Sequence, residues 1–432
     1  MNKLEKNKVI KNIYNIKNLT ISYKDNDPYN MYYKSNLIKE LNLNEQTIDN
    51  INETSNLYNK IKLTNEFDLM LKYGTKFNDT DILINTYPDI PYLTYSNKWT
   101  GIDTNFDNIT LSYSSINNYY HCAFRYYIEN ILKLNIYDES FKQFIGTMFH
   151  NILSHVYEEN FNFETHWNNY LKDKEFSKKE VFYLKDLKTE LKKTIDILKY
   201  QYKLTGLTNL KLENEITLKY DDKHVFKGII DKIMFKEKEN NTYISIIDYK
   251  TGSPKVNITN LKYGIDMQLP VYVHLILKSD LFQNPKIIGF YLQQILHNKS
   301  SFEKKKDDNE KTLDNLKLQG WTINDQYLVE MFDETYENSE MIKSMKVTKS
   351  GFGYYSKVLS EDAIIKLSTL VEDKVIDAFN LIDNKDFSIN PKVIGGENIG
   401  CNYCKYQDLC FKTGKDLVYL PEEKDLSYLE NN

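Results

Sequence analysis

The sequence predicts an α/β fold in which a strand meander is flanked by helices, together with a mostly helical N-terminal region. Three stretches rich in β-branched and apolar residues follow one another closely, at Leu210–Tyr220, Val225–Lys236 and Thr242–Lys250, and predict the meander. Apolar residues at helical spacing predict a long charged helix over Asp173–Tyr202 and an apolar helix over Asp266–Leu277. The 432 residues, of which 27% are charged and 14% aromatic, suit two or three globular domains rather than a disordered chain.

Residues 1–105 are expected to form a separate region. It is rich in Asn and Lys and contains short helix-like pieces at Ser35–Leu43 and Thr64–Tyr73. Leu19–Pro28 followed by Ser35–Leu41 resembles a segment near the end of superfamily 1 helicase modules, so we interpret the region as a helicase remnant or an adaptor. No G-x-x-x-x-G-K-[ST] phosphate loop occurs in the sequence, and we therefore expect this chain not to hydrolyse ATP.

Residues 106–415 are expected to form the domain that carries the chemistry, and residues 416–432 a C-terminal tail. Ser112 or Ser114 would cap a first helix. A second helix is predicted over Glu139–Phe161, where apolar side chains recur at near-helical spacing. The other predicted elements are a strand at Lys286–Leu296, a charged loop at Asn298–Lys311, a turn at Ser350–Gly353 and a long helix from Ser360 to about Asn384.

Charge and hydropathy limit the classes of partner. The net charge of −5 excludes a basic surface over the whole chain, so a nucleic-acid footprint would have to be local. No apolar signal core follows the first residues, and no stretch approaches the roughly 20 apolar residues of a membrane span. We therefore expect a cytoplasmic protein with no membrane partner.

Acidic and basic residues gather where two predicted strands end. Asp248 and Lys250 share one face of the strand that continues the apolar run Ile244–Ile247, because side chains alternate along a strand. Asp231, in the strand-like stretch just before it, delivers a second carboxylate. Two carboxylates and a lysine brought together by neighbouring strands can hold a divalent metal beside a phosphate. Taken singly, a D-x-K triple is also typical of a solvated strand end, Asp231 could cap a turn, and His150 fits a buried core histidine.

The four cysteines point to a metal or cluster site, since structural disulfides are not expected in a reducing cytosol. Cys401, Cys404 and Cys410 have the spacing C-x2-C-x5-C, which suits ligation, and Cys122 would complete a set of four. Zinc and an iron–sulfur cluster both accept four thiolates. Structural zinc usually uses paired C-x2-C knuckles, whereas here one cysteine lies far upstream of the other three.

These motifs follow one another in a particular order along the chain. The order is Tyr119-x2-Cys122, Gly146-x3-His150, Gly228-x2-Asp231, Asp248-Tyr-Lys250, Gln268-x3-Tyr272 and Cys401-x2-Cys404-x5-Cys410. This order resembles the RecB-like branch of the PD-(D/E)XK nucleases, and within it the iron–sulfur nuclease domain of AddB-type helicase–nuclease subunits. The resemblance covers roughly residues 108–415 and implies a restriction-endonuclease-like core, with a central mixed sheet flanked by helices.

The resemblance also implies a role for each matching residue. Asp231 and Asp248 would bind Mg²⁺ or Mn²⁺, with His150 and the backbone carbonyl of Tyr249 as further ligands. Lys250 would be the catalytic lysine, whose ammonium can orient water and stabilise developing negative charge.

The remaining matches concern the support of the site. Gln268 and Tyr272 match the motif that supports the active site and the substrate in this branch. Glu215 stands where relatives often carry an acidic residue. The resemblance favours a 4Fe–4S cluster over zinc at the cysteines, in a structural role that closes a very long loop.

The implied function is a metal-dependent DNA nuclease. We expect an exonuclease that acts on single-stranded ends within a helicase–nuclease complex for double-strand break repair and recombination. Arg125, Lys232 and Lys255 are candidate contacts to DNA phosphates. Two alternatives are a CRISPR-adaptation iron–sulfur nuclease, whose members are generally much shorter, and a non-catalytic scaffold that binds DNA ends, for which a degraded site would be expected.

Overall fold

The chain divides into two compact units in the computed structural model, Met1–Tyr95 and Ser96–Asn432. The structure describes residues 3–21, 56–73, 106–134, 140–254, 256–296, 313–423 and 425–430, with a few further positions between 38 and 87. Within this described part, no helix is both long and apolar enough to span a membrane.

The described part of the first unit contains two helices, α1 (Lys3–Ile13) and α3 (Asn56–Tyr73). The helix-like piece expected at Thr64–Tyr73 lies within α3, which begins earlier than expected and buries Leu63 completely. The piece expected at Ser35–Leu43 and the helicase-like resemblance beyond residue 21 fall almost entirely outside the described residues.

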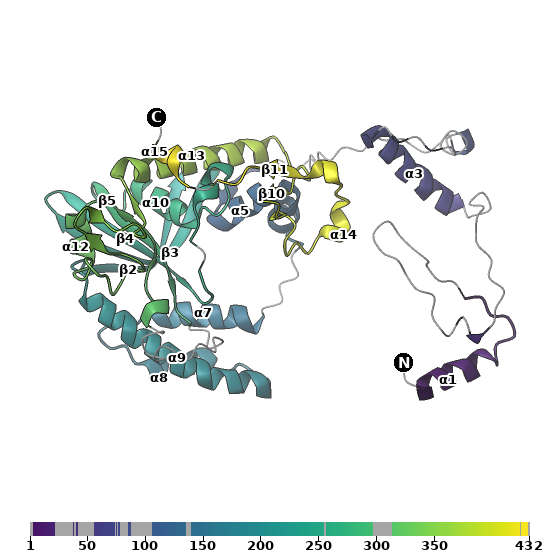
Figure 1. Ribbon diagram of the computed structural model, residues 1–432, viewed down its shortest axis with the longest axis horizontal. Coiled ribbons are helices and arrows are strands. Elements are labelled where there is room, and N and C mark those ends of the chain that lie inside the picture. Colours follow the sequence, from purple (N-terminus) through teal and green to yellow (C-terminus); the bar gives the residue numbers. More distant parts are fainter. Residues whose placement is uncertain are drawn as a thin grey trace. The chain divides into compact units, whose positions relative to one another are not determined.

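The second unit is built around a seven-stranded mixed sheet (Figure 1). Its strands are β1 (Ile109–Leu111), β2 (Asn209–Lys219), β3 (His224–Lys238), β4 (Asn241–Lys250), β5 (Pro285–Gln294), β6 (Gln319–Ile323) and β9 (Val358–Leu359). The order is β1-β3-β4-β5-β6-β9, with β2 along the other edge of β3. The pairs β4/β5, β1/β3 and β6/β9 are parallel and the other pairs antiparallel, so the expected mixed sheet is confirmed.

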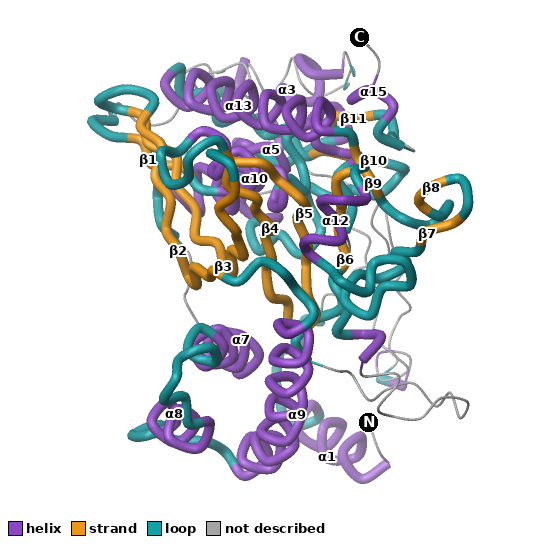
Figure 2. Tube along the Cα trace, turned by 90° about the vertical axis from the view of Figure 1, so that its left-hand side faces the viewer, coloured by secondary structure: helices purple, strands orange, loops and turns teal. Residues whose placement is uncertain are grey.

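Helices lie on both sides of this sheet. In Figure 1, α10 and α13 lie above the sheet and α7, α8 and α9 below it, and the Cα trace in Figure 2 shows the same arrangement from the side. The helices of the unit are α5 (Tyr113–His121), α6 (Ala123–Tyr126), α7 (Phe141–Leu153), α8 (Phe163–Leu171), α9 (Lys178–Lys203), α10 (Gln268–Lys278), α12 (Gln326–Phe332), α13 (Glu361–Asp383), α14 (Gln407–Cys410) and α15 (Ser427–Glu430).

Serine caps define where several of these helices begin. Ser112, Ser140, Ser177 and Ser360 each accept a backbone N–H of the first turn, of α5, α7, α9 and α13 respectively. Such a bond satisfies a donor that a helix start would otherwise leave open. Of the two candidates for the first cap, Ser112 is the one that caps α5 and Ser114 lies within the helix, and Ser360 caps the long helix as expected. The helix expected over Glu139–Phe161 is shorter, because a series of turns replaces it after Leu153.

The core of the unit is continuous and apolar on both faces of the sheet. Met148 and Ile152 of α7, Phe226 and Ile246 of the sheet, and Leu275 of α10 are completely buried. Gly228 of β3 is part of this packing, because a Cβ at this position would lie 2.7 Å from a Leu275 side-chain atom. Glycine therefore lets α10 approach β3 closely, which places the beginning of α10 next to the strands that carry the acidic residues.

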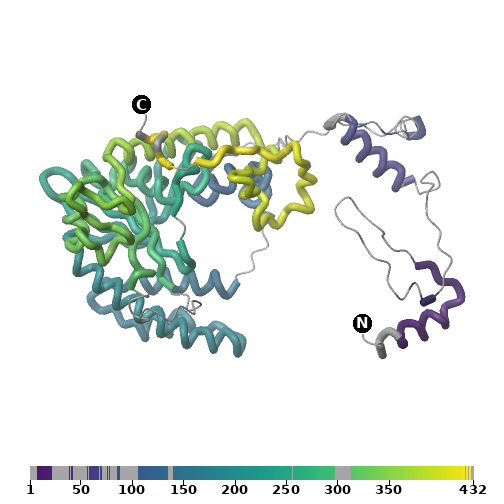
Figure 3. Tube along the Cα trace, viewed as in Figure 1, coloured from purple at the N-terminus to yellow at the C-terminus, as the bar shows by residue number. Residues whose placement is uncertain are grey.

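The sequence predicts a tail over residues 416–432, but in the structure this segment contains a short strand and a short helix of the second unit. In the structure β11 (Val418–Leu420) pairs in parallel with β10 (Lys392–Ile394), and Leu426, just before α15, and Leu429, within it, are buried. Figure 3 shows this C-terminal segment, in yellow, lying beside the blue segment around α5. A separate antiparallel hairpin is formed by β7 (Val347–Thr348) and β8 (Gly351–Phe352).

Candidate metal and phosphodiester site

The candidate site lies where β4 separates from β3. The β3/β4 ladder ends at the pair Lys232–Ile247, and β1 takes over the same edge of β3 only at His224–Phe226. Asp231 is the first residue of β3 beyond the ladder, and its Oδ2 accepts the backbone N–H of Tyr249 at 2.6 Å. A side-chain carboxylate thus takes the place of a backbone acceptor at this strand fork, which fixes its direction.

Asp248 is held by three side chains. Its Oδ1 accepts hydrogen bonds from Gln268 Nε2 at 2.8 Å and Tyr272 OH at 3.0 Å, and Gln268 also donates to Tyr272 OH at 3.0 Å. Gln268 and Tyr272 lie four residues apart at the beginning of α10, so they share one helix face. Asp248 Oδ2 lies 2.7 Å from Lys250 Nζ in an ion pair, while no hydrogen bond reaches this buried oxygen from the described residues.

The electrostatics of Asp248 reflect its crowded surroundings. Burial raises the pKa of Asp248 to about 6, the nearby charge of Asp231 adds to this rise, and Lys250 opposes it. Two buried carboxylates that repel one another in this way are stabilised by a cation placed between or beside them. The structure therefore brings Asp231, Asp248 and Lys250 into one electrostatically coupled group.

His150 reaches the site from α7, on the other side of the sheet from α10. Its Nδ1 lies 3.3 Å from Asp231 Oδ2 and 3.7 Å from Glu213 Oε1. Burial by itself lowers the pKa of His150, but hydrogen bonding to Asp231 and Glu213 outweighs burial and raises this pKa to about 10. Within the described residues, His150, Glu213 and Asp231 are the one set of three whose ligand atoms all lie within 4.8 Å of each other.

This donor set fits a divalent cation. Two carboxylate oxygens and one imidazole nitrogen converge, and hard oxygen ligands are those that Mg²⁺ and Mn²⁺ prefer. The proton that joins His150 to the carboxylates would leave when a cation binds. Tyr249 lies in the same place, with its N–H on Asp231 and its ring 6.1 Å from that of His150, and its carbonyl as a ligand stays a prediction.

Glu213 is an acidic residue of the site that the sequence motifs do not identify. They point instead to Glu215, whose side chain is half exposed and pairs with Lys227 at 3.2 Å, away from the site. Glu213 and Asp231 are equally far along the chain from Asp222, at the centre of the β2–β3 turn, so an antiparallel hairpin sets them opposite one another. That symmetry about the Asp221-Asp222 turn is the signal that could have identified Glu213.

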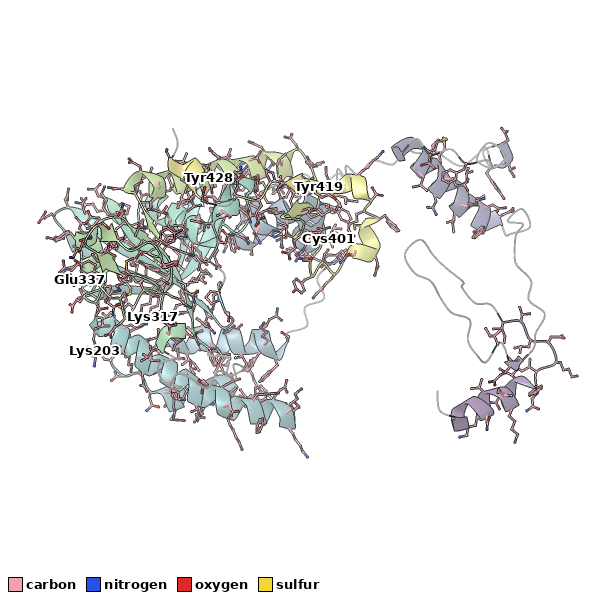
Figure 4. All side chains as sticks on the ribbon, in the orientation of Figure 1. Lys203, Lys317, Glu337, Cys401, Tyr419 and Tyr428 are labelled. Carbon is pink, nitrogen blue, oxygen red and sulfur yellow. The ribbon has the colours of Figure 1, made fainter. Side chains whose placement is uncertain are left out.

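The four cysteines line a single cavity, together with Arg125, Pro391 and Lys412. Cys122 lies between α5 and α6, Cys401 and Cys404 lie in a turn, and Cys410 ends α14. Figure 4 labels Cys401 in this C-terminal part of the unit. The segments are held together by hydrogen bonds to the backbone, since Asn390 Oδ1 accepts the Ala123 N–H at 2.8 Å.

The thiols are more widely spaced than the ligands of a single tetrahedral ion. No three cysteine sulfurs in the described part of the chain lie within 4.8 Å of one another. Zinc bonded to sulfur at about 2.3 Å would bring the sulfurs to within roughly 4 Å. The four thiols therefore lie around one cavity without forming a preassembled zinc site among the described residues.

The three expected DNA contacts have different outcomes. Lys232 is wrong as a DNA contact, because it is only 3% exposed and its Nζ donates to Tyr157 OH at 2.7 Å. Burial lowers the pKa of Lys232 to about 7. Arg125 pairs with Glu129 at 3.0 Å, and Lys255 lies outside the described residues.

A mixed sheet flanked by helices, with two carboxylates and a lysine at the fork of two strands, places the second unit in the α/β class. The sequence model of the PD-(D/E)XK nuclease superfamily matches residues 110–411, and the chain belongs to this superfamily. The membership expected from the order of the motifs is thereby confirmed.

The chain is also similar to curated proteins named as one subunit of an ATP-dependent helicase/deoxyribonuclease. It is 25% identical to that of Clostridium acetobutylicum over 365 residues, which cover 74% of this chain and 31% of the relative. It is 26% identical to that of Clostridium perfringens over 355 residues, 71% of this chain and 30% of the relative. For Thermoanaerobacter sp. the identity is 28% over 208 residues, 46% and 18% of the two chains. The chain spans about a third of the first two relatives.

Proposed function

We propose that this chain is a divalent-metal-dependent deoxyribonuclease that degrades single-stranded DNA from its ends. The observation that supports this most is the convergence of His150, Glu213 and Asp231, with Asp248 and Lys250 beside them at the strand fork. Three carboxylates and an imidazole with an ammonium beside them provide the chemistry that phosphodiester hydrolysis requires.

Each residue has a distinct part in this proposal. Asp231, Glu213, Asp248 and His150 would hold Mg²⁺ or Mn²⁺, which when bound neutralises phosphoryl charge and supplies a nucleophilic water. Gln268 and Tyr272 occupy Asp248 Oδ1, so they orient the other oxygen of this carboxylate toward the site. Lys250, whose side chain is 34% exposed, can present its ammonium to a phosphate oxygen.

Substitution at the strand fork tests the proposal. Asp248→Asn and Lys250→Gln should each lower cleavage of end-labelled single-stranded DNA in Mn²⁺ by about 10²- to 10³-fold or more. Asp222→Asn, in the exposed β2–β3 turn, is the matched control and should cleave like the unmodified protein. Full activity of the Asp248→Asn protein would overturn the assigned site, and labels at the 5′ and 3′ ends would establish polarity.

The names of the relatives support a partner. Because the relatives are named as a subunit of an ATP-dependent helicase/deoxyribonuclease, we infer that this chain acts with a helicase subunit in DNA break repair. Affinity purification from the native source, followed by an unwinding-coupled degradation assay on linear duplex, tests this. Degradation that requires neither ATP nor a second protein would contradict the partner while leaving the nuclease proposal in place.

We also propose that the cysteine cavity holds a 4Fe–4S cluster with a structural role. The proposal rests on the four thiols around one cavity and on the resemblance of their order along the chain to that of iron–sulfur nuclease domains. Anaerobic purification should give a coloured protein with about four irons per chain. A colourless protein that carries one zinc would contradict it.

A further inference from the structure

A basic hairpin stands at one edge of the sheet and has no role in the site described above. We define it as Lys343–Lys357, which includes β7 and β8. Lys343, Lys346, Lys349 and Lys357 are all exposed, and none of them forms an ion pair with a described residue. No aspartate or glutamate occurs between residues 341 and 360. The hairpin is therefore a concentrated positive patch on a chain whose net charge is −5.

Strand register places this hairpin at the same end of the sheet as the candidate site. Asp248 of β4 pairs with Leu292 of β5, which pairs with Gln319 at the beginning of β6. The hairpin leads directly into β9, whose first residue Val358 pairs with Thr322 of β6 in parallel. Residues that precede β9 therefore extend toward the level of Asp248.

At the base of the hairpin, Lys357 contacts the loop that follows Lys250. Lys357 Nζ donates to the carbonyl of Val256 at 3.4 Å. Val256 and Gln268 line the same small cavity beside the site. Three inter-strand steps of about 4.8 Å separate β4 from β9, so the strand that the hairpin leads into lies roughly 14 Å from β4.

Two tyrosines add an aromatic surface to this charge. Tyr354 is 94% exposed and Tyr355 is 78% exposed, and their rings pack edge to face at 5.1 Å. Figure 2 shows β7 and β8 projecting from the sheet beyond β6 and β9. Bases of a single strand stack on exposed aromatic rings of this kind, while lysines contact the phosphates.

We propose that the basic hairpin binds single-stranded DNA and guides it into the site at Asp248 and Lys250. This rests on the proposed nuclease function, whose substrate path it defines. A single strand fits better than a duplex, because only unpaired bases offer their faces to Tyr354 and Tyr355.

Binding without cleavage tests the lysines. The full chain is mixed with a fluorescent oligo-dT in EDTA, so that no cleavage occurs, and anisotropy is measured across a range of salt concentrations. The triple variant Lys343→Gln, Lys346→Gln and Lys349→Gln should lower the slope of log affinity against log salt by about 2, since each single-strand phosphate contact contributes about 0.7. Affinity at about 0.1 M salt should fall roughly a hundredfold. The matched control is Lys178→Gln, Lys179→Gln and Lys185→Gln on exposed positions of α9, which should bind like the unmodified protein.

Stacking is tested separately. The variant Tyr354→Ser with Tyr355→Ser should weaken single-strand binding by about tenfold or more, while binding of a blunt duplex of the same length stays unchanged. The control is Phe182→Ser with Tyr183→Ser, another exposed edge-to-face aromatic pair, on α9. Thermal unfolding of all variants should match the unmodified protein, because the substituted side chains are on the surface.

The outcomes separate this proposal from the proposed function. Wild-type affinity and salt slope in the triple-lysine variant would overturn the hairpin proposal, even if the protein cleaves DNA. Loss of binding in the hairpin variants, with no Mn²⁺-dependent cleavage by the unmodified protein, would support the hairpin and overturn the nuclease. In an active protein, the hairpin variants should raise KM for a long strand and leave kcat unchanged.

Discussion

Glu213 and Glu215 lie two residues apart on β2, yet only Glu213 faces the site. We expect Glu213→Gln to lower Mn²⁺ affinity and cleavage about 10- to 100-fold, the range found when a group that supports a metal site is removed. Glu215→Gln is the matched control and should change neither, since its ion pair with Lys227 is exposed. Calorimetric titration with Mn²⁺ measures the affinity. Equal effects of the two substitutions would show that Glu213 is not a ligand.

Sequence alone could identify the residues that belong to motifs but not those that the fold adds. Asp231, Asp248, Lys250, Gln268 and Tyr272 were expected near one another from their order, and the structure brings them together. Their catalytic roles stay predictions.

Two residues show what the motifs leave out. Glu213 lies at a position of positive φ, 44°, where the β2 ladder is irregular, so simple alternation does not reveal its direction. The burial of Lys232 could not be predicted either, because its hydrogen bond goes to the hydroxyl of Tyr157, which is distant in sequence.

At the level of elements, Gly400 allows its own backbone to lie close to the backbone of His121 and of Lys392 beside the cysteine cavity. A Cβ at residue 400 would lie 2.6 Å from the His121 carbonyl oxygen and 2.7 Å from the Lys392 nitrogen, both of them backbone atoms. Gly400→Ala should therefore lower stability by about 1–3 kcal/mol and reduce iron content, as measured by thermal unfolding and iron assay. Gly414→Ala, where a Cβ meets nothing within 4 Å, should behave like the unmodified protein. Unchanged stability and iron in the Gly400→Ala protein would contradict this packing argument.

His274 joins α10 to two neighbours, and we expect its burial to make the free energy of unfolding depend on pH. Its Nε2 lies 3.0 Å from Tyr220 OH and its Nδ1 lies 3.1 Å from Ser368 Oγ of α13. Burial lowers the pKa of His274 to about 4, whereas the unfolded chain has the ordinary value near 6.5. As the pH falls, His274 therefore binds a proton in the unfolded chain before it does so in the folded chain. The contribution of neutral His274 to the free energy of unfolding is complete above about pH 6.5 and is lost toward pH 4.

Urea unfolding at pH 7 and pH 5 checks this expectation. Between these pH values, the free energy of unfolding should fall by roughly 2 kcal/mol more in the unmodified protein than in a His274→Gln variant. The reason is that a single proton contributes up to about 1.4 kcal/mol per pH unit. Asn151→Gln, at an exposed position of α7 with no ionisable side chain, serves as the substitution control and should lose as much as the unmodified protein. Parallel losses in the protein and the His274→Gln variant would rule out the assignment.

Elements with strong periodicity were predictable, whereas short strands were not. The β2–β4 meander, α10 and α13 were expected close to their observed bounds, because each has a long apolar pattern and turn or cap residues. The strands β1, β6 and β9 have five residues or fewer, and each pairs with a strand distant in sequence. Their pairing depends on tertiary contacts, which a local pattern does not contain.

For the whole molecule, all the proposed site residues and all four cysteines lie in the second unit. A fragment of residues 96–432 should therefore fold alone and cleave a short single strand in Mn²⁺ within about twofold of the full chain, as expected for an independent domain. Circular dichroism and the end-label assay measure this. An inactive or aggregated fragment would show that residues 1–95 are part of the nuclease fold.

The sequence predicted that Cys122 would meet the three C-terminal cysteines, but it did not predict the structure of the C-terminal segment around them. Spacing suggested four ligands, and the structure brings Cys122 and the C-terminal cysteines to one cavity. The parallel pairing of β10 with β11 and the burial of Leu429 could not be predicted, because these elements have only three or four residues and depend on tertiary contacts.

The strand fork has a consequence for genetic experiments. Asp231 meets a backbone N–H that the departing strand leaves without a ladder partner, so its carboxylate also maintains the fold. Asp231→Ala would leave that buried donor unsatisfied, at a cost of about 1–3 kcal/mol. Loss of function in such an allele would then reflect both the lower stability of the protein and the loss of catalysis. Asp248 accepts its hydrogen bonds from side chains alone, so an Asp248→Asn allele is the cleaner inactive form for separating the protein's presence from its activity.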